Sequence, residues 1–292
     1  MMADFLMGYS IQSWLESCPQ GYLDGTDYGH QAGEKEPESL LDNETFREDA
    51  IRTTVQLIAG ERAALAASSG LVNAAPDDPS KMFLATQTLD EARHVEIFTQ
   101  RLYDLGVKKD ELDSVISTYV NPNLVKFAEV LLEKVDKQDF IAGVVGQNIV
   151  LEGMAFSVFE MMHATNHTNN PKFAHTLSGT IADERRHVGF GENRIGSLIQ
   201  AHPEKKEEIQ KMQQEMTYHM LATFTDSFKT NEDIIEEVQA QTMNDSAPAV
   251  FHGVDLARAD AREMEAVLAN TVLGEFKTRL GRIGLEYLSP AA

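Results

Sequence analysis

The chain has 292 residues, 42% of them hydrophobic, which is the composition of an ordinary globular protein with material for a large core. Its net charge of −21 argues against nucleic acid and anionic membranes as partners, because both require a basic surface. The single cysteine excludes an intramolecular disulfide and a thiolate metal site. Without a signal-peptide pattern or a run of roughly 18 apolar residues, we expect a cytoplasmic protein with no membrane span.

Helical periodicity begins after an irregular arm, residues 1–45, which contains one short amphipathic helix. Asn43 or Thr45 caps the first long helix, and we expect Gly70 to end it. Strand alternation of useful length is not evident, so residues 46–292 are expected to form one all-α domain. Further helical segments are expected over residues 78–106, 108–119, 122–135, 138–164, 171–201, 203–230 and 254–287.

Two copies of one short motif, DEARH and DERRH, stand out in this helical pattern. Each copy has a glutamate three residues before a histidine, in the pairs Glu91 and His94, and Glu184 and His187. Residues three apart lie on the same face of a helix, about one turn from each other. Each motif can therefore direct a carboxylate and an imidazole to one point.

A further glutamate precedes each motif in an apolar run, Glu61 in LIAGERAALA and Glu152 in IVLEGMAF. The separation from Glu61 to Glu91 is 30 residues, and that from Glu152 to Glu184 is 32. Four carboxylates and two histidines in two matched halves are the ligand set of a two-metal centre in a four-helix bundle. A ligand set of carboxylates and imidazoles without sulfur suits iron or manganese. We place this metal-binding core at about residues 46–201.

Within this centre we assign Glu91 and Glu184 as the bridging ligands and Glu61 and Glu152 as the terminal ones. Each metal also takes one histidine. A solvated acidic helix face would explain any single Glu-x-x-His motif better than a metal site does. It does not explain two motifs and two lone glutamates at matched spacing.

The residues flanking the motifs suit a supporting role around the metals. A ligating histidine normally donates its second ring N–H to a carboxylate, which fixes its orientation. We expect Asp90 to contact His187 and Asp183 to contact His94. Arg93 and Arg186 are expected to neutralise the surrounding acidic charge: both lie inside the motifs.

The segments LDEARH, ADERRHVGFG, GER and LEGMAF resemble the ferritin-like carboxylate-bridged dimetal superfamily. The branch they resemble most is that of the ribonucleotide reductase small-subunit-like proteins, which includes R2-like ligand-binding oxidases and the hydroxylases of bacterial multicomponent monooxygenases. The resemblance covers roughly residues 45–200. It implies an R2-like, ferritin-like four-helix bundle with additional helices, two metal ions per chain (Fe/Fe or Mn/Fe) reacting with O2, and a homodimer.

Departures from each subfamily leave the reaction type open. Phe98 occupies the position of the radical tyrosine of reductase small subunits, and Gln147 and Ala64 replace the cross-linked tyrosine and valine of the R2-like ligand-binding oxidases. Thr180 stands where the p-aminobenzoate-type N-oxygenases have an extra histidine, and Phe156 stands where the monooxygenase hydroxylases often have threonine. The signature of each subfamily is therefore incomplete.

Two groups of residues near the motifs have ordinary explanations as well as functional ones. Glu160 and His163 form a third Glu-x-x-His, which we interpret as polar residues near the end of a helix that do not bind metal. Residues close to the expected ligands would suit a pocket for an apolar substrate, although bundle packing explains them about as well. These residues are Ala64, Leu65, Ser68, Phe98, Gln147, Phe156 and Phe190.

The sequence thus predicts a dimetal oxidase or oxygenase that acts with O2 on a small, apolar organic substrate and receives electrons from a reductase. One alternative is a radical-generating ribonucleotide reductase small subunit without the usual tyrosine. The other is a non-catalytic ferritin-like protein that stores metal or binds a ligand.

Overall fold

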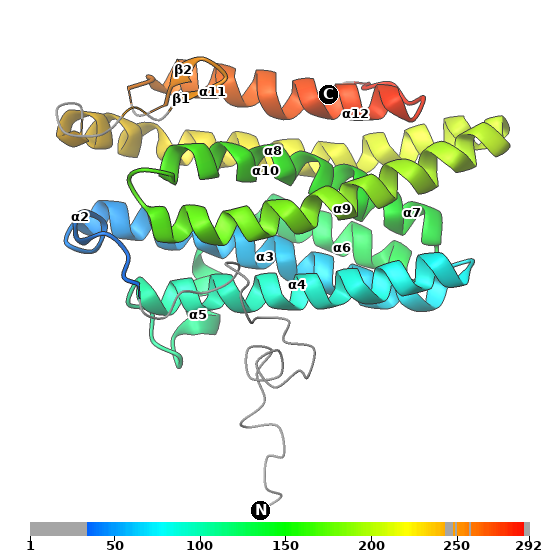
Figure 1. Ribbon diagram of the computed structural model, residues 1–292, viewed down its shortest axis with the longest axis horizontal. Coiled ribbons are helices and arrows are strands. Elements are labelled where there is room, and N and C mark those ends of the chain that lie inside the picture. Colours follow the sequence, from blue (N-terminus) through cyan, green and yellow to red (C-terminus); the bar gives the residue numbers. More distant parts are fainter. Residues whose placement is uncertain (1–33, 243–247, 249, 257, 289–292) are drawn as a thin grey trace, which may run out of the picture.

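The computed structural model describes residues 34–242, 248, 250–256 and 258–288, so residues 1–33 of the predicted N-terminal arm lie outside the described residues. In the described part, long helices lie side by side along one direction (Figure 1). The helical elements are α2 (Glu38–Leu41), α3 (Glu44–Ala74), α4 (Asp78–Asp104), α5 (Leu112–Tyr119), α6 (Pro122–Asp136), α7 (Phe140–Val144), a π-helix η1 (Val145–Leu151), α8 (Glu152–Asn166), α9 (Pro171–Ala201), a 3₁₀ turn η2 (Pro203–Lys205), α10 (Lys206–Thr242), α11 (Ala261–Leu268), a π-helix η3 (Ala269–Leu273) and α12 (Gly274–Arg282).

Polar side chains fix the beginnings of the long helices. Asn43 caps α3, Asp77 caps α4 and Asn170 caps α9, each by accepting a hydrogen bond from the backbone N–H three residues further on. Such a bond satisfies one of the backbone donors that the first turn of a helix leaves free. These caps set where each helix starts, and hence the height at which its ligand residues lie.

The prediction that Gly70 ends the first long helix is wrong, because α3 continues to Ala74. Gly70 instead lies against Val135 of α6, where a Cβ on the glycine would stand 2.3 Å from the valine Cγ1. The glycine therefore permits a close helix–helix contact, a role that a sequence cannot distinguish from a helix stop.

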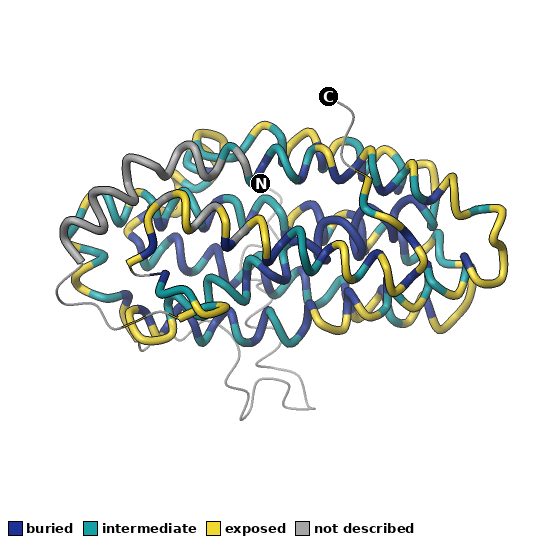
Figure 2. The backbone as a smooth tube through the Cα atoms, turned by 90° about the horizontal axis from the view of Figure 1, so that it is seen from above, coloured by how far each residue is buried: buried dark blue, intermediate teal, exposed yellow. Residues whose placement is uncertain are grey.

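Five helical elements surround the centre of the bundle: α3 packs on α4, α8 packs on α9, and η1 contacts both α3 and α9. Outside these, α6 lies against α3, α10 lies against α6 and η1, and α12 lies against α8 and α9. The inward faces of the helices are buried and the outward faces exposed (Figure 2). The buried apolar side chains form two clusters, the larger one around Leu71, Leu131 and Phe276 and the smaller one around Ile58 and Phe98.

A π-helix interrupts the helix expected over residues 138–164, which runs from Phe140 to Asn166. A π-helical turn brings residues four and five apart onto one face. Gln147 and Asn148 therefore lie on the same side of the helix as Glu152, and both donate hydrogen bonds to it. The local departure from α geometry is what directs all three side chains to the bundle centre.

This same helix is apolar enough to cross a membrane by length and composition, contrary to our expectation from the sequence. Its most apolar window has a mean hydropathy of 1.4 and is 83% buried inside the fold. A buried core helix passes this test as readily as a membrane span does, so the feature is weak evidence for a membrane.

The C-terminal segment expected as one amphipathic helix over 254–287 is divided, and this prediction is wrong in its extent. Strands β1 (Val250–Phe251) and β2 (Val254–Asp255) form a small antiparallel hairpin before α11 begins. His252 and Gly253 between them both have positive φ angles, of 47° and 84°. Two such residues make the two-residue turn that joins short antiparallel strands.

Candidate metal centre

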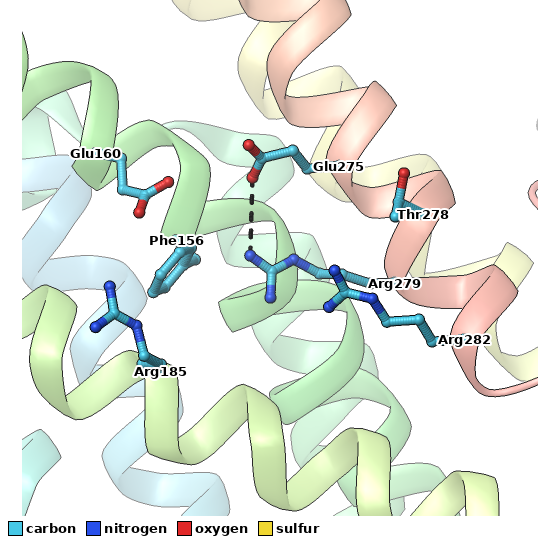
Figure 3. A pocket seen from close by; sticks show the side chains of 7 residues that line it. All are labelled: Phe156, Glu160, Arg185, Glu275, Thr278, Arg279 and Arg282. Carbon is cyan, nitrogen blue, oxygen red and sulfur yellow. Dashed lines mark ion pairs between the residues drawn. The ribbon is translucent and has the colours of Figure 1, made fainter.

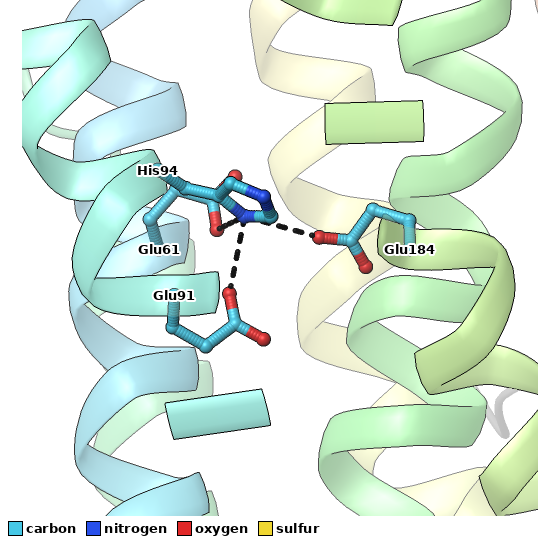
Figure 4. A group of neighbouring side chains, drawn as sticks. All are labelled: Glu61, Glu91, His94 and Glu184. Carbon is cyan, nitrogen blue, oxygen red and sulfur yellow. Dashed lines mark hydrogen bonds and ion pairs between the residues drawn. The ribbon is translucent and has the colours of Figure 1, made fainter. Parts of the chain in front are cut away.

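The six side chains predicted to bind metal come together at the centre of the bundle. They lie on four elements, Glu61 on α3, the first motif on α4, Glu152 at the start of α8 and the second motif on α9. All six are buried, and the most exposed of them, Glu61, is only 5% exposed. Figure 4 shows three of the carboxylates converging on one imidazole from both sides of the bundle.

The first group of ligand atoms surrounds His94. Its Nδ1 lies 3.3 Å from Glu61 Oε2, 3.4 Å from Glu91 Oε2 and 3.5 Å from Glu184 Oε1 (Figure 4). One atom of each residue falls within 4.8 Å of the others, which is close enough for a single cation to contact all four.

The second group surrounds His187. Its Nδ1 lies 3.3 Å from Glu91 Oε1, 3.5 Å from Glu184 Oε2 and 3.8 Å from Glu152 Oε1. Glu91 and Glu184 thus direct one oxygen toward each histidine. By contrast, Glu61 faces only the first imidazole and Glu152 only the second. This arrangement agrees with the bridging and terminal roles that we assigned from the sequence, and these roles remain proposals.

The outer nitrogens of the two histidines make the crossed contacts expected from the sequence. His94 Nε2 lies 3.1 Å from Asp183 Oδ2, and His187 Nε2 lies 3.1 Å from Asp90 Oδ2. An N–H donated to an aspartate leaves Nδ1 of the same ring with its lone pair toward the glutamates. The aspartates therefore select the tautomer that a metal ion requires.

The two motif arginines lie next to these aspartates. Arg93 forms an ion pair with Asp183. Arg186 donates to Asp183 Oδ1 at 2.6 Å and to Asp90 Oδ2 at 3.0 Å. Both arginines thus contact the aspartates that face the histidines, and the charge-compensating role that we expected for them remains a proposal.

Burial and charge shift the pKa values of the glutamates and histidines strongly. Burial raises the pKa of Glu61 to about 8, and burial together with the charge of Glu184 raises that of Glu152. Burial disfavours the charged form of His94, but the carboxylates of Glu61 and Glu91 outweigh it and raise its pKa to about 10. Without a cation, the cluster therefore holds protons in the places where metal ions would supply positive charge.

Several ligand atoms in this cluster are buried without a hydrogen-bond partner among the described residues. They are His187 Nδ1, Glu91 Oε2 and Glu184 Oε2. Buried polar atoms are nearly always paired, so orphaned ones in a native fold need a partner that the chain does not supply. Two cations that accept nitrogen and carboxylate ligands fit these atoms, and iron and manganese are such cations.

Three carboxamides, Gln87, Gln147 and Asn148, donate hydrogen bonds to Glu152. Two of them, Gln87 and Asn148, were not predicted from the sequence as residues of the site. Gln87 lies one turn before Glu91, and Asn148 lies four residues before Glu152. Both are fully buried. A polar residue one helical turn from an expected ligand is the signal that would have found them.

The residues predicted to line a substrate pocket are placed in several different environments. Gln147 Nε2 donates to Ser68 Oγ at 2.5 Å and to the Ala64 carbonyl at 3.2 Å, so these three belong to the surroundings of Glu152. Leu65, next to Ala64 on α3, is only partly buried. A common pocket for all seven residues therefore remains a prediction.

The three phenylalanines of the predicted pocket also lie in different parts of the bundle. Phe98 is fully buried in the smaller apolar cluster, with its ring 6.5 Å from that of Phe159. Phe190 stacks on Phe83 at 4.2 Å, and Phe83 in turn meets the edge of the His187 ring at 6.3 Å. Phe190 is thus linked to the centre through a second ring.

Phe156 lies instead in a cleft of about 410 Å³ between α8, α9 and α12 (Figure 3). Its ring lies between two guanidinium groups, Arg279 at 4.7 Å and Arg185 at 5.8 Å. Glu160 of the third Glu-x-x-His lines the same cleft and does not belong to either group of ligand atoms. The remaining lining residues are Glu275, Thr278 and Arg282, so acidic and basic side chains face each other there.

The helical arrangement and this cluster define an all-α protein of the ferritin-like, R2-like fold class. No protein-family model and no curated protein sequence matches the chain. Solved structures do match it: a mutant R2-like ligand-binding oxidase with an aerobically reconstituted Mn/Fe cofactor has a TM-score of 0.68 and 16% identity over 84% of both chains.

Two further matches agree with this one. The R2-like ligand-binding oxidase with an aerobically reconstituted Mn/Fe cofactor (long soak) has a TM-score of 0.67 and 17% identity, over 84% of this chain and 83% of that one. A protein with aldehyde deformylating oxidase activity from Synechococcus has a TM-score of 0.59 and 16% identity, over 84% of this chain and 94% of that one. At these identities the similarity confirms the predicted fold, and the activity has to be argued from the site.

Proposed function

We propose that this chain is an oxidoreductase that holds two metal ions, Fe/Fe or Mn/Fe, and uses O2 to oxidise a small organic substrate. The observation that carries the proposal is the pair of overlapping ligand groups, one around His94 and one around His187, with Glu91 and Glu184 facing both. The packing of an apolar core does not require a buried carboxylate that faces two histidines. Burying such a carboxylate without a cation costs free energy.

The residues of the chain hold the metals and control their surroundings. Glu91 and Glu184 would bridge the two ions, while Glu61 and His94 would complete one coordination sphere and Glu152 and His187 the other. When bound, the ions supply the redox chemistry that activates O2. The aspartates keep each imidazole oriented, and the buried helices around the centre exclude water from it.

Solved structures of the same fold support an oxidase, since their names include R2-like ligand-binding oxidases with Mn/Fe cofactors and an aldehyde deformylating oxidase. We further propose an apolar substrate, a reductase as electron donor and a cytoplasmic homodimer. An apolar substrate suits Phe83 and Phe190, since their rings stack on each other and the Phe83 ring lies 6.3 Å from that of His187. The acidic net charge of −21 agrees with a chain that does not bind nucleic acid.

Metal loading under exclusion of O2 tests the proposal. The purified chain is treated with Fe(II), with and without Mn(II), and is then exposed to O2 while absorption and EPR spectra are recorded. We expect about two metal ions per chain and spectral changes that depend on O2. Fewer than two ions per chain, with no O2-dependent change, would overturn the proposal.

Addition of small organic substrates to the loaded chain separates the two alternatives. A radical-generating subunit without the usual tyrosine, which Phe98 replaces, would oxidise no added substrate and would require a large partner subunit for its activity. A storage protein would take up many more than two ions without oxidising a substrate. Neither alternative is favoured by a feature of the described residues.

A further inference from the structure

Three carboxamides bind the carboxylate of Glu152, and we call Gln87, Gln147 and Asn148 the amide cluster. Glu152 Oε1 accepts hydrogen bonds from Gln87 Nε2 at 2.6 Å and from Gln147 Nε2 at 3.2 Å. Glu152 Oε2 accepts one from Asn148 Nδ2 at 2.8 Å. All three amide side chains are fully buried, so no water competes for these donors.

The amide cluster is itself held in place. Asn148 Nδ2 also donates to Gln87 Oε1 at 3.1 Å and to the His187 carbonyl at 3.3 Å. Gln147 Nε2 is anchored by Ser68 Oγ at 2.5 Å. Because these donors come from both α4 and η1, Glu152 cannot rotate without breaking hydrogen bonds to two elements. A buried donor or acceptor that loses its partner costs about 1–3 kcal/mol.

The corresponding glutamate of the other half has no such support. Gln56 and Leu57 occupy the positions five and four residues before Glu61, as Gln147 and Asn148 do before Glu152. The amide of Gln56 turns away and donates to the backbone carbonyls of Arg52 and Tyr119. Within the described part of the chain, Glu61 is hydrogen-bonded to His94 and to no carboxamide.

The two motifs also differ in the residue that lies one helical turn before the motif glutamate. Gln87 lies four residues before Glu91, and the matching residue before Glu184 is Thr180. The hydroxyl of Thr180 is directed to the backbone carbonyl of Thr176, at 3.4 Å, rather than to a carboxylate. Leu57 and Thr180 thus replace two of the three carboxamides in the other half. The third carboxamide, Gln56, is retained but donates to backbone carbonyls instead of to Glu61.

We propose that Gln87, Gln147 and Asn148 are positioning residues that make the metal position at Glu152 and His187 rigid and distinct from the position at Glu61 and His94. The inference rests on the proposed function, since it concerns the same metal centre. With three donors fixed, Glu152 offers its ion one geometry. Glu61, which has no carboxamide donors, is the terminal ligand free to change the way it binds. The two positions therefore differ in affinity.

Titration of the full metal-free chain with Mn(II), in the absence of O2, tests this inference. The EPR signal of free Mn(II) gives the affinity of each binding step, and the variants His94→Ala and His187→Ala identify which step belongs to which position. Gln147→Met and Asn148→Leu remove amide donors at nearly constant volume. Gln87 is left unaltered, because its Nε2 also donates to Glu91 Oε1 at 3.3 Å and Glu91 faces both histidines. Thr180→Val is the matched control in the other half.

We expect both amide variants, Gln147→Met and Asn148→Leu, to weaken the step that His187→Ala removes, by roughly 10- to 100-fold, which is typical of residues that support metal ligands. The step that His94→Ala removes stays unchanged, and Thr180→Val alters neither. Circular dichroism shows which variants are folded, and the two amide variants provide independent tests if one of them is not.

The outcomes also separate this inference from the proposed function. Equal affinities for both positions in the unaltered chain overturn the inference, as do amide variants that weaken both steps together or neither. In each of these cases two ions still bind, so the metal centre itself stands. An unaltered chain that binds no Mn(II) or Fe(II) overturns the proposed function instead.

Discussion

Gly191 of α9 lies against Asn148 of the π-helix so closely that a Cβ on the glycine would stand 2.5 Å from the Asn148 Cβ. A side chain of any size is therefore excluded at residue 191. The contact brings α9 and η1 together beside the metal centre, where Asn148 reaches both Glu152 and the His187 carbonyl. The last glycine of the segment VGFG thus controls a helix–helix distance.

Gly191→Ala should destabilise the fold by about 1–3 kcal/mol, because the added methyl group meets a rigid, fully buried neighbour. Denaturant unfolding of the metal-free chain measures this loss. Gly189→Ala is the control, since nothing lies within 4 Å of a Cβ at that position on the same helix. The control should be neutral or stabilising by up to about 1 kcal/mol, as alanine favours a helix over glycine. Equal effects of the two substitutions would contradict the role of the close contact.

Glu91→Ala should abolish binding of two metal ions, because Glu91 contributes one oxygen to each histidine group. The metal content of the purified variant after loading with Fe(II) gives the result. Glu160→Ala is the control: it changes the third Glu-x-x-His, which lines the cleft at Phe156 and lies outside both ligand groups. If Glu160→Ala lost metal and Glu91→Ala retained it, our assignment of the centre would be wrong.

The crossed aspartates predict an effect on single positions. Asp183→Asn should weaken metal binding at the His94 position by about 10- to 100-fold, because His94 Nε2 loses the carboxylate that orients it. Asp90→Asn should do the same at the His187 position. Stepwise Mn(II) titration of both variants distinguishes the positions. Parallel pairing would be indicated if each aspartate acted on the histidine of its own motif.

The amino-acid sequence was sufficient to predict the all-α fold and the residues that gather at the centre. Both follow from short-range patterns: Glu91 with His94 and Glu184 with His187 share a helix face, and the helix face decides where a side chain points. The crossed pairing of Asp90 and Asp183 was also predictable, because the need of a ligating histidine for a carboxylate is general.

Part of the site depends on departures from regular helix geometry and on contacts between distant elements. Gln147, which we expected in a substrate pocket, faces Glu152 because η1 is a π-helix and brings residues five apart onto one face. Gln87 and Asn148 each lie one α-helical turn before a glutamate ligand, so regular periodicity was enough to predict them. Gly70 looked like a helix stop because its neighbour Val135 is far away in the sequence. The short β1–β2 hairpin was missed because two-residue strands have no periodicity to detect.

The metal-free chain should lose stability as the pH rises from about 6.5 to about 8. The pKa of His94 in the folded chain, about 10, lies above its ordinary value of 6.5, so its favourable contacts are complete below 6.5 and are lost as the pH rises toward 10. Glu61 acts in the same direction: its pKa is raised from 4.5 to about 8, so the folded chain retains a proton that the unfolded chain has released.

Urea unfolding of the metal-free chain at pH 6.5 and at pH 8 measures this dependence. Glu61→Gln keeps the shape of the side chain but cannot ionise, so this variant should show a weaker dependence on pH. Glu91 does not contribute in this range, because its pKa is lowered to about 2, chiefly by the two histidines acting against burial. Stability that rises with pH over the range would contradict the assigned protonation of the cluster.

A buried ion pair anchors the end of the N-terminal arm to the bundle. Glu36, only 3% exposed, accepts hydrogen bonds from Arg101 Nε at 3.2 Å and from Asn170 Nδ2 at 2.5 Å. The Arg101 guanidinium also lies 3.4 Å from the centre of the Phe173 ring. One carboxylate thus joins the arm to α4 and to the cap of α9, the two helices that carry the motifs.

Glu36→Ala should cost about 3–5 kcal/mol of unfolding free energy, because it leaves the Arg101 charge buried without its carboxylate. Thr54 Oγ1, at 2.8 Å from Arg101, keeps one hydrogen bond but supplies no charge. Glu129→Ala is the control, since its partner Lys126 and Glu129 itself are more than half exposed and water replaces their attraction. Thermal and urea unfolding should separate the two variants clearly. Equal stabilities would mean that the arm contributes nothing to the bundle, although its carboxylate is buried.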